Sequence, residues 1–129
     1  MTTRTARCSC GGLAVAAAGE PARNSVCHCL KCKRRTGSAF SWNATYAEAQ
    51  VEISGEHSAY TRISDRGSWV RHHYCPECGT RMFYEIELRP GMVSIPVGAF
   101  ADPGFPAPAV EVFGERRCAW IPELAPLQE

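Results

Sequence analysis

Seven of the eight cysteines fall into three short groups, and their spacing constrains the fold more than any other feature. The groups are C-x-C at Cys8 and Cys10, C-x-C-x-x-C at Cys27, Cys29 and Cys32, and C-x-x-C at Cys75 and Cys78. Clusters of this kind favour metal binding over a disulfide framework. The chain is therefore expected to bring turns from distant parts of the sequence together around metal ions.

The segment Cys75-Pro76-Glu77-Cys78-Gly79 is the most specific of these motifs. Proline fixes φ at the start of the turn, and glycine after the second cysteine permits a conformation in which backbone amides donate to sulfur. Two cysteines cannot complete a tetrahedral zinc site, so two further ligands must come from elsewhere. The most economical assignment predicts a closed structural zinc site formed by Cys8, Cys10, Cys75 and Cys78.

The central group has three cysteines and no obvious fourth ligand beside it. A catalytic zinc site typically keeps three protein ligands and an open position, whereas a structural site uses four. We therefore expect a catalytic zinc ion bound by Cys27, Cys29 and Cys32, which gives two Zn²⁺ per chain. The alternative is a non-catalytic binding module for a protein or nucleic acid, with the site closed by His28 or Cys118. A thiol redox protein is less favoured, because bound metal would mask the nucleophiles.

Composition restricts the class of protein and its partners. A length of 129 residues, with 45% hydrophobic and 21% charged residues, predicts one globular domain spanning residues 1–129. If seven cysteines bind two zinc ions as thiolates, the formal charge of +1 becomes about −2, which disfavours nucleic acid as a partner. No apolar run approaches ~20 residues, and no secretory signal precedes Cys8. The sequence therefore predicts a cytoplasmic protein without membrane contact.

Short β-type segments between turn residues predict a mainly β fold with little helix. Strands are expected at 3–6, 13–17, 24–26, 38–46, 51–53, 58–64, 68–74, 81–88, 92–97 and 110–113, and an ordered loop at 102–108. Brief helical turns are expected at 33–36, ended by Gly37, and at 47–50, with the central cysteines on a loop before the first turn. The basic run Lys31, Lys33, Arg34 and Arg35 is either solvated surface, which is favoured, or a cradle for an anionic substrate.

Five titratable side chains close to the cysteine motifs are candidates for proton transfer, although each type is more often structural. They are His28, His72, His73, Glu85 and Glu87. His28 lies between two expected ligands in the sequence, and we expect it to point away from the metal or to orient a thiolate.

The order and spacing of the three motifs resemble the glutathione-dependent formaldehyde-activating enzyme family, which includes the centromere protein V group. The resemblance extends from Cys8 to about Trp120. It implies antiparallel sheets like those of the Mss4 group and two zinc sites, one structural and one catalytic. The ligands implied are Cys8, Cys10, Cys75 and Cys78 for the structural zinc, and Cys27, Cys29 and Cys32 for the catalytic zinc. The implied activity is that of a carbon–sulfur lyase, which adds glutathione to formaldehyde or catalyses the reverse cleavage.

Three features depart from the family pattern. His72 lies three residues before the first knuckle cysteine, where relatives often carry arginine. No glutathione pocket can be recognised in the sequence. Cys118 is additional to the seven motif cysteines, and we expect it to be a buried thiol. The expected partner is a small thiol such as glutathione, while the true thiol and carbonyl substrates and homodimerisation are left open.

Overall fold

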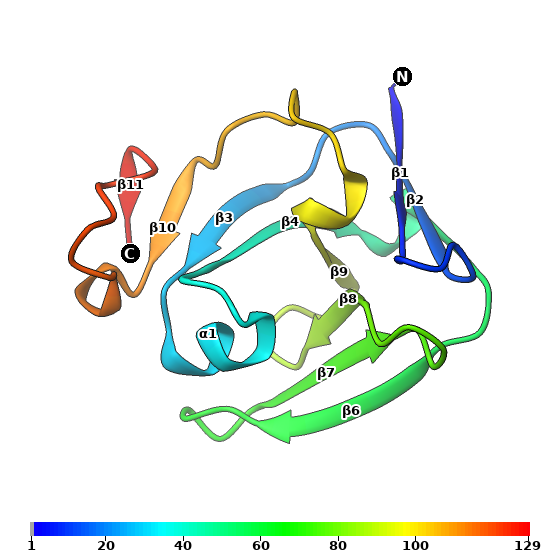
Figure 1. The fold of residues 1–129 in the computed structure, drawn as a ribbon, viewed down its shortest axis with the longest axis horizontal. Coiled ribbons are helices and arrows are strands. Elements are labelled where there is room, and N and C mark those ends of the chain that lie inside the picture. Colours follow the sequence, from blue (N-terminus) through cyan, green and yellow to red (C-terminus); the bar gives the residue numbers. More distant parts are fainter. Residues whose placement is uncertain (1) are drawn as a thin grey trace.

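The computed structural model describes residues 2–129, which form two β-sheets (Figure 1). The smaller sheet has the order β1-β2-β5, with β1 at Thr3–Arg7, β2 at Ala14–Ala18 and β5 at Val51–Ser54. Strands β1 and β2 form the predicted hairpin, in which Thr3 is opposite Ala18 and Arg7 is opposite Ala14. The hairpin turn carries Cys8 and Cys10 at one end of this sheet.

The larger sheet has eight strands in the order β11-β10-β3-β4-β9-β8-β7-β6. Their bounds are Arg23–Cys27 for β3, Ser41–Ala47 for β4, Ser58–Ile63 for β6, Trp69–Tyr74 for β7, Arg81–Ile86 for β8, Met92–Pro96 for β9, Val110–Val112 for β10 and Leu127–Gln128 for β11. Pairing is antiparallel from β3 to β6, whereas β10 runs parallel to both β3 and β11. The prediction of a mainly β fold is confirmed, although this sheet is mixed.

Helix α1, Leu30–Thr36, connects β3 to β4 and begins three residues earlier than the predicted turn. Its N-terminus is capped by Cys29, whose Sγ accepts a hydrogen bond from the backbone N–H of Cys32 at 3.2 Å. A cysteine cap is easily missed, because Ser, Thr, Asp and Asn are the usual capping residues. The helix ends as predicted at Gly37, with a φ of 65°. The central cysteines therefore lie at the end of β3, at the N-cap of α1 and within α1, and not on a loop alone.

The remaining helical segments are short 3₁₀ turns at Glu48–Gln50, Val97–Phe100 and Gly114–Arg116. The first corresponds to the helical turn expected at 47–50. Within residues 2–129, no helix has the length and hydrophobicity needed to cross a bilayer.

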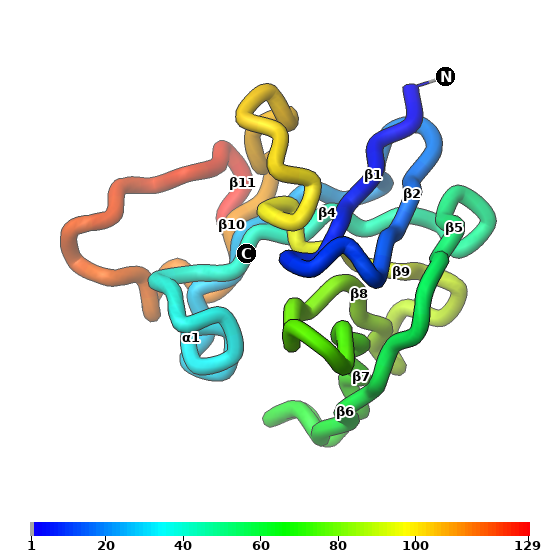
Figure 2. Tube along the Cα trace, turned by 45° about the vertical axis from the view of Figure 1, so that its right-hand side comes forward, coloured from blue at the N-terminus to red at the C-terminus, as the bar shows by residue number. Residues whose placement is uncertain are grey.

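The hydrophobic core is formed by residues of both sheets. Leu13 and Val15 from the β1–β2 hairpin belong to the same buried cluster as Tyr46, Met82 and Ile95 from β4, β8 and β9. All five side chains are fully buried. Burial of an aliphatic or methionine side chain of this size contributes roughly 1.5–3 kcal/mol. Packing in the core therefore holds the β1–β2 turn close to β8. The tube view shows the two backbone segments next to each other (Figure 2).

The C-terminal region departs most from the predicted pattern. Segment 102–108 is an ordered loop, as expected, and the side-chain amide of Asn24 donates to Pro106 O at 2.8 Å and Ala107 O at 3.1 Å. Strand β11 was not predicted, because its two residues are both exposed and give no alternating pattern. It extends the sheet beyond β10 and places the chain end beside β10, on the side away from β3 (Figure 1).

Candidate functional site

Two hairpin turns bring four cysteines together at one end of the molecule. Cys8 and Cys10 lie in the β1–β2 turn, and Cys75 and Cys78 lie in the β7–β8 turn (Figure 2). The four Sγ atoms lie within 4.8 Å of one another. Cys8 and Cys75 are buried, whereas Cys10 and Cys78 are exposed. We call these residues the four-cysteine group.

Backbone hydrogen bonds hold each turn of the four-cysteine group in shape. In the first turn, the N–H of Leu13 donates to Cys8 Sγ at 3.2 Å. In the second, the N–H of Gly79 donates to Cys75 O at 2.8 Å, and Gly79 has a φ of 76°. Thr80 links the turns, because its Oγ1 accepts from the N–H of Ser9 at 3.2 Å. The structure thus brings the C-x-C motif at Cys8 and the C-x-x-C motif at Cys75 together, as the sequence predicted.

The second group consists of Cys27, Cys29 and Cys32. Cys27 is the last residue of β3, Cys29 caps α1, and Cys32 lies in its first turn. Their Sγ atoms also lie within 4.8 Å of one another, and all three residues are half-buried. No fourth cysteine, histidine or carboxylate of residues 2–129 joins this three-cysteine group.

The pKa values of the thiols in the three-cysteine group differ strongly from that of a free cysteine. Hydrogen bonds with Cys29 and then Cys32, followed by burial, raise the pKa of Cys27. Hydrogen bonds from Cys27 and then Cys29 lower the pKa of Cys32 to about 2. The thiols therefore interact closely, and ionisation of one of them disfavours ionisation of the others. A cation can replace the thiol protons, because opposite charge favours the ionised form of each thiol.

His28 lies behind the three-cysteine group and contacts Glu111 of β10. Nε2 of His28 lies 2.5 Å from Oε2 of Glu111, and both side chains are fully buried. Glu111 also accepts hydrogen bonds from the side chains of Arg117 and Gln128 and from the backbone N–H of Leu124. Burial alone would raise the pKa of Glu111, but bonds from Gln128, Arg117, Leu124 and His28 lower it to about 2. His28 thus points away from the thiols, as expected, and ties their loop to the C-terminal segment.

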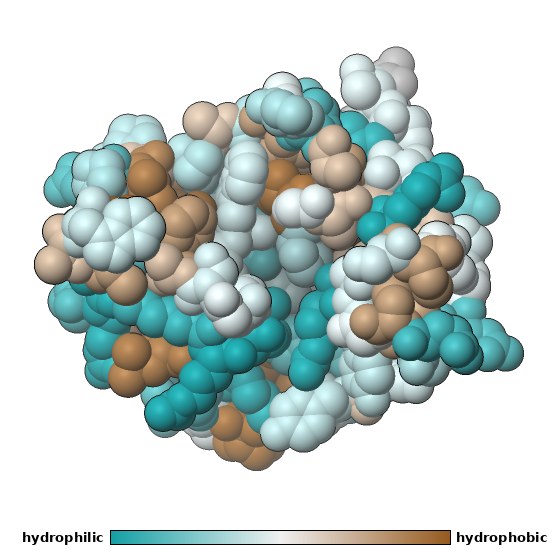
Figure 3. Space-filling view, in the orientation of Figure 1, coloured by the Kyte–Doolittle hydropathy of each residue, from teal (hydrophilic) through white to brown (hydrophobic). Residues whose placement is uncertain are grey.

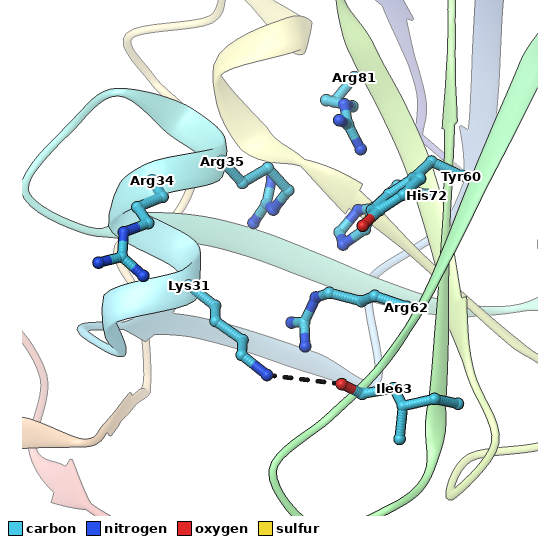
Figure 4. A pocket seen from close by; sticks show the side chains of 8 residues that line it. All are labelled: Lys31, Arg34, Arg35, Tyr60, Arg62, Ile63, His72 and Arg81. Atoms are coloured by element: carbon cyan, nitrogen blue, oxygen red, sulfur yellow. Dashed lines mark hydrogen bonds between the residues drawn. The ribbon is translucent and has the colours of Figure 1, made fainter.

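A cavity of about 470 Å³ lies between α1 and strands β6–β8. Its lining comes from α1 (Lys31, Arg34 and Arg35), β6 (Tyr60, Arg62 and Ile63), β7 (His72) and β8 (Arg81), as Figure 4 shows. We call it the basic cleft. Hydrophilic residues also gather on the surface over α1 and the gap towards β6 (Figure 3). Three residues of the basic run, Lys31, Arg34 and Arg35, therefore line a cavity, whereas Lys33 does not.

The other candidates for proton transfer lie in different places. His72 is the only one of the five that lines the basic cleft. His73 Nε2 lies 2.6 Å from Glu85 Oε1, and its Nδ1 lies 3.2 Å from His57 Nδ1. Glu87 accepts from the N–H of Trp69 at 3.0 Å. His73, Glu85 and Glu87 already have partners outside the cleft, which leaves His72 as the one candidate of the five that faces this cavity.

Cys118 does not have the environment expected for it. The residue is half-buried, not buried, and its Sγ accepts from Lys33 Nζ at 3.5 Å. It is not a member of the three-cysteine group. Neither His28 nor Cys118 therefore supplies the fourth ligand that the binding-module alternative requires.

Three residues around the site were not identified from the sequence. Glu111 stands alone in a short apolar strand, and Arg62 and Arg81 have the ordinary charge pattern of half-exposed strand residues. Only the pairing of β3 with β10, and of β6 with β7 and β8, brings them to the site. No local signal identifies them, because the contacts are non-local.

The donor sets of both cysteine groups fit a thiophilic metal. Four clustered thiols match a closed structural zinc site, and three match a zinc site with an open position. The two groups could each hold a metal ion. Fold and site together define a mainly β, metal-binding protein with two thiol clusters of different ligand number.

The chain belongs to the glutathione-dependent formaldehyde-activating enzyme family, because the family model matches residues 3–116. Two relatives are provisionally named glutathione-dependent formaldehyde-activating enzymes. The one from Fusarium vanettenii is 30% identical over 81 residues, covering 63% of this chain and 43% of the relative. The one from Aspergillus flavus is 28% identical over 81 residues, covering 63% of this chain and 42% of the relative. The chain thus matches less than half of the length of these relatives.

A solved structure supports the fold assignment. The crystal structure of a Rhodobacter sphaeroides protein superimposes with a TM-score of 0.58, at 20% sequence identity, and the match covers 79% of this chain and 90% of that chain. At this identity the likeness concerns the fold alone.

Proposed function

We propose that this chain is a single-domain, zinc-dependent carbon–sulfur lyase that joins a small thiol such as glutathione to formaldehyde. The observation that carries the proposal is the three-cysteine group, whose thiols lie together without a fourth protein ligand among residues 2–129. In the proposal Cys27, Cys29 and Cys32 hold the catalytic zinc. Cys8, Cys10, Cys75 and Cys78 hold the structural zinc.

Bound at the three-cysteine group, zinc would supply a Lewis acid that polarises oxygen and favours the thiolate form of a substrate. The residues of this chain would do the positioning. Cys29 caps α1, so the helix and the metal-binding loop are one unit. The bond between His28 and Glu111 fixes the loop from behind. The basic cleft would receive the acidic groups of the thiol.

The proposed reaction requires one new bond and one proton transfer. An electron pair of the thiolate sulfur forms the carbon–sulfur bond, and the π pair of the carbonyl moves to oxygen. That oxygen takes up a proton, so the thiol proton is recovered in the hydroxymethyl group. The reverse reaction breaks the same carbon–sulfur bond and returns the proton to sulfur. No external oxidant or reductant is needed.

The choice of glutathione and formaldehyde is supported by the family and by the names of the two relatives. The reaction also requires reduced thiols, and none of the eight cysteines is in a disulfide. We therefore include a reducing compartment, the cytoplasm, in the proposal.

The test is the rate of S-hydroxymethylglutathione formation from glutathione and formaldehyde, measured by NMR against the spontaneous rate. The zinc-loaded protein should exceed the buffer rate, and Cys29→Ser should return it to that rate, because it removes a proposed zinc ligand. Cys118→Ser is the matched control, since it also removes one half-buried thiol but lies outside the three-cysteine group. Equal rates for the zinc-loaded protein, Cys29→Ser and buffer would overturn the proposal.

A further inference from the structure

The basic cleft contains more positive charge than the protein neutralises. Five of its eight lining residues are Lys or Arg, and none is acidic. Lys31 forms an ion pair with Asp65 at 2.8 Å. Within residues 2–129, the other four cations, Arg34, Arg35, Arg62 and Arg81, have no carboxylate partner. Guanidinium groups remain charged at all physiological pH values, so the cleft carries a net positive potential.

His72, which lines the cleft together with these cations, has a ring nitrogen without a hydrogen-bond partner. The residue is 3% exposed, and its Nε2 has no hydrogen-bond partner in the described part of the chain. Nη1 of Arg81 is likewise buried and unpartnered. Burial first, and then the charges of Arg35, Arg81 and Arg62, lower the pKa of His72 to about 3. The imidazole is therefore neutral at pH 7 and can donate one N–H. Buried polar groups without partners are uncommon, and an absent ligand is one explanation for two in one cavity.

The unpartnered groups converge on one volume. Figure 4 shows the guanidinium groups of Arg35, Arg62 and Arg81 directed from three elements towards the space beside the His72 ring. Guanidinium groups bind carboxylate and phosphate oxygens in a bidentate manner. A group with a single negative charge would leave most of these cations unmatched.

We propose that the basic cleft binds a substrate group with two negative charges, a dicarboxylate or a phosphate monoester. Its oxygens would lie between Arg35, Arg62 and Arg81, with the imidazole of His72 as a further donor. The lining offers no carboxylate for an ammonium group. The cleft therefore selects thiols by the number of acidic groups at one end, and glutathione, whose two carboxylates lie at opposite ends, is a less complete match.

The position of the cleft connects it with the proposed chemistry. Arg35, which lines the cleft, belongs to the same short helix as Cys32 of the three-cysteine group. That the bound anion is part of the substrate rests on the proposed function. The anion site itself does not, because it follows from the charges and unpartnered atoms of the cleft.

Binding of simple anions to the zinc-loaded protein tests the inference without any turnover. The probes are inorganic phosphate, succinate and acetate, titrated at constant ionic strength and followed by NMR of the arginine Nε–H signals. Phosphate or succinate should bind at least ~10-fold more tightly than acetate, because the second negative charge accepts additional charge-assisted hydrogen bonds from the guanidinium groups. Tighter binding of succinate would indicate a dicarboxylate, and tighter binding of phosphate would indicate a phosphate monoester.

Three variants locate the binding. Arg62→Gln should weaken binding of the preferred anion by about 10-fold, because it removes the guanidinium of a half-buried residue in the edge strand β6. His72→Phe keeps a ring and should weaken it less. Arg7→Gln is the matched control, since it makes the same change at an exposed position of β1. Equal affinity for acetate, succinate and phosphate, or equal weakening by Arg62→Gln and Arg7→Gln, would overturn the inference.

The outcome is separable from the lyase assay. Selective anion binding without accelerated adduct formation would support the site and reject the proposed reaction. Accelerated adduct formation without selective anion binding would support the reaction and reject the site.

Discussion

The four-cysteine and three-cysteine groups use the same ligand atom but differ in how the chain supplies it. The first takes its thiols from two hairpin turns more than 60 positions apart, with Cys8 and Cys75 buried against the core. The second takes all three from six consecutive residues at the start of one helix, and none of them is fully buried. Replacing one cysteine should therefore affect stability more in the four-cysteine group than in the three-cysteine group.

On this basis we expect the four-cysteine group to stabilise the fold and the three-cysteine group to carry the proposed chemistry. A metal at the four-cysteine group would close a long loop, because it would join the β1–β2 and β7–β8 turns. A metal at the three-cysteine group would close only a few residues, and it would have three protein ligands and not four. The comparison leads to predictions in which the same type of substitution has different effects at the two groups.

The largest effect is expected from Cys75→Ser. The residue belongs to the buried core, and apparent binding free energies of structural zinc reach roughly 10–16 kcal/mol in small zinc domains. We expect Cys75→Ser to lose the native β-sheet signal in circular dichroism and to retain less than one zinc ion per chain by elemental analysis. The wild type should hold two.

The partner variant is Cys29→Ser, which makes the same atomic change at the three-cysteine group. It should retain the β-sheet spectrum and one zinc ion per chain, because this group lies outside the core cluster. The comparison fails if Cys29→Ser unfolds as completely as Cys75→Ser, or if Cys75→Ser keeps both ions.

A smaller loss of stability is expected from Glu111→Gln. Glu111 is fully buried and receives hydrogen bonds from Arg117, Gln128 and Leu124, besides its contact with His28. Breaking a buried charge pair typically costs about 3–5 kcal/mol in the free energy of unfolding. Denaturant unfolding should show this loss, whereas Glu115→Gln, at an exposed position four residues away, should stay within ~0.5 kcal/mol of the wild type.

The same variant predicts a pH dependence. The folded-state pKa of Glu111 is about 2, below its ordinary value, so its ionised form contributes stability above about pH 4.5. This contribution is lost as the pH falls from about 4.5 towards about 2. The stability difference between Glu115→Gln and Glu111→Gln should therefore shrink over this range. A difference that stays constant would show that the charge of Glu111 is not responsible.

Sequence reasoning recovered the thiol groups and most strands, but it missed Glu111, Arg62 and Arg81 around the three-cysteine group and the basic cleft. The cysteines are recognisable because their spacing is local and chemically specific, and the β1–β2 hairpin follows from its turn. Glu111 and Arg62 carry no such signal, since their roles arise from strand pairing across the larger sheet. The start of α1 was missed for a related reason, because its capping group is a thiol that the sequence assigns to metal binding.

The next expected effect concerns metal removal from the wild type. A colorimetric chelator should remove zinc in two phases, and the three-cysteine group should lose its ion first, because it offers one thiolate fewer and is half-buried throughout. A tenfold separation of the phases corresponds to about 1.4 kcal/mol. Cys29→Ser should lack the fast phase. If the fast phase persists in Cys29→Ser, the assignment of the weaker site is wrong.

The smallest effect is expected from alanine at two glycines, one in the β7–β8 turn of the four-cysteine group and one at the end of α1. Gly79 follows the knuckle of the four-cysteine group and Gly37 ends α1, with φ values of 76° and 65°. At neither position would a Cβ atom meet another atom within 4 Å, so the local cost is backbone strain alone, about 1–2 kcal/mol at each. Because the expected strain is equal, Gly79→Ala and Gly37→Ala can be compared directly for their effects on zinc retention.

The two alanine variants should therefore differ in zinc retention more than in stability. Gly79 donates its N–H to Cys75 O, within the turn that contains Cys75 and Cys78. Gly37 donates its N–H to Lys33 O at the C-terminal end of α1, more than one helical turn after Cys32. Gly79→Ala should speed the slow phase of chelation, because strain in that turn displaces ligands directly. Gly37→Ala should leave that phase unchanged and affect the fast phase only through fraying of α1. A faster slow phase in both variants would mean that the two groups are coupled through the sheets and are not independent.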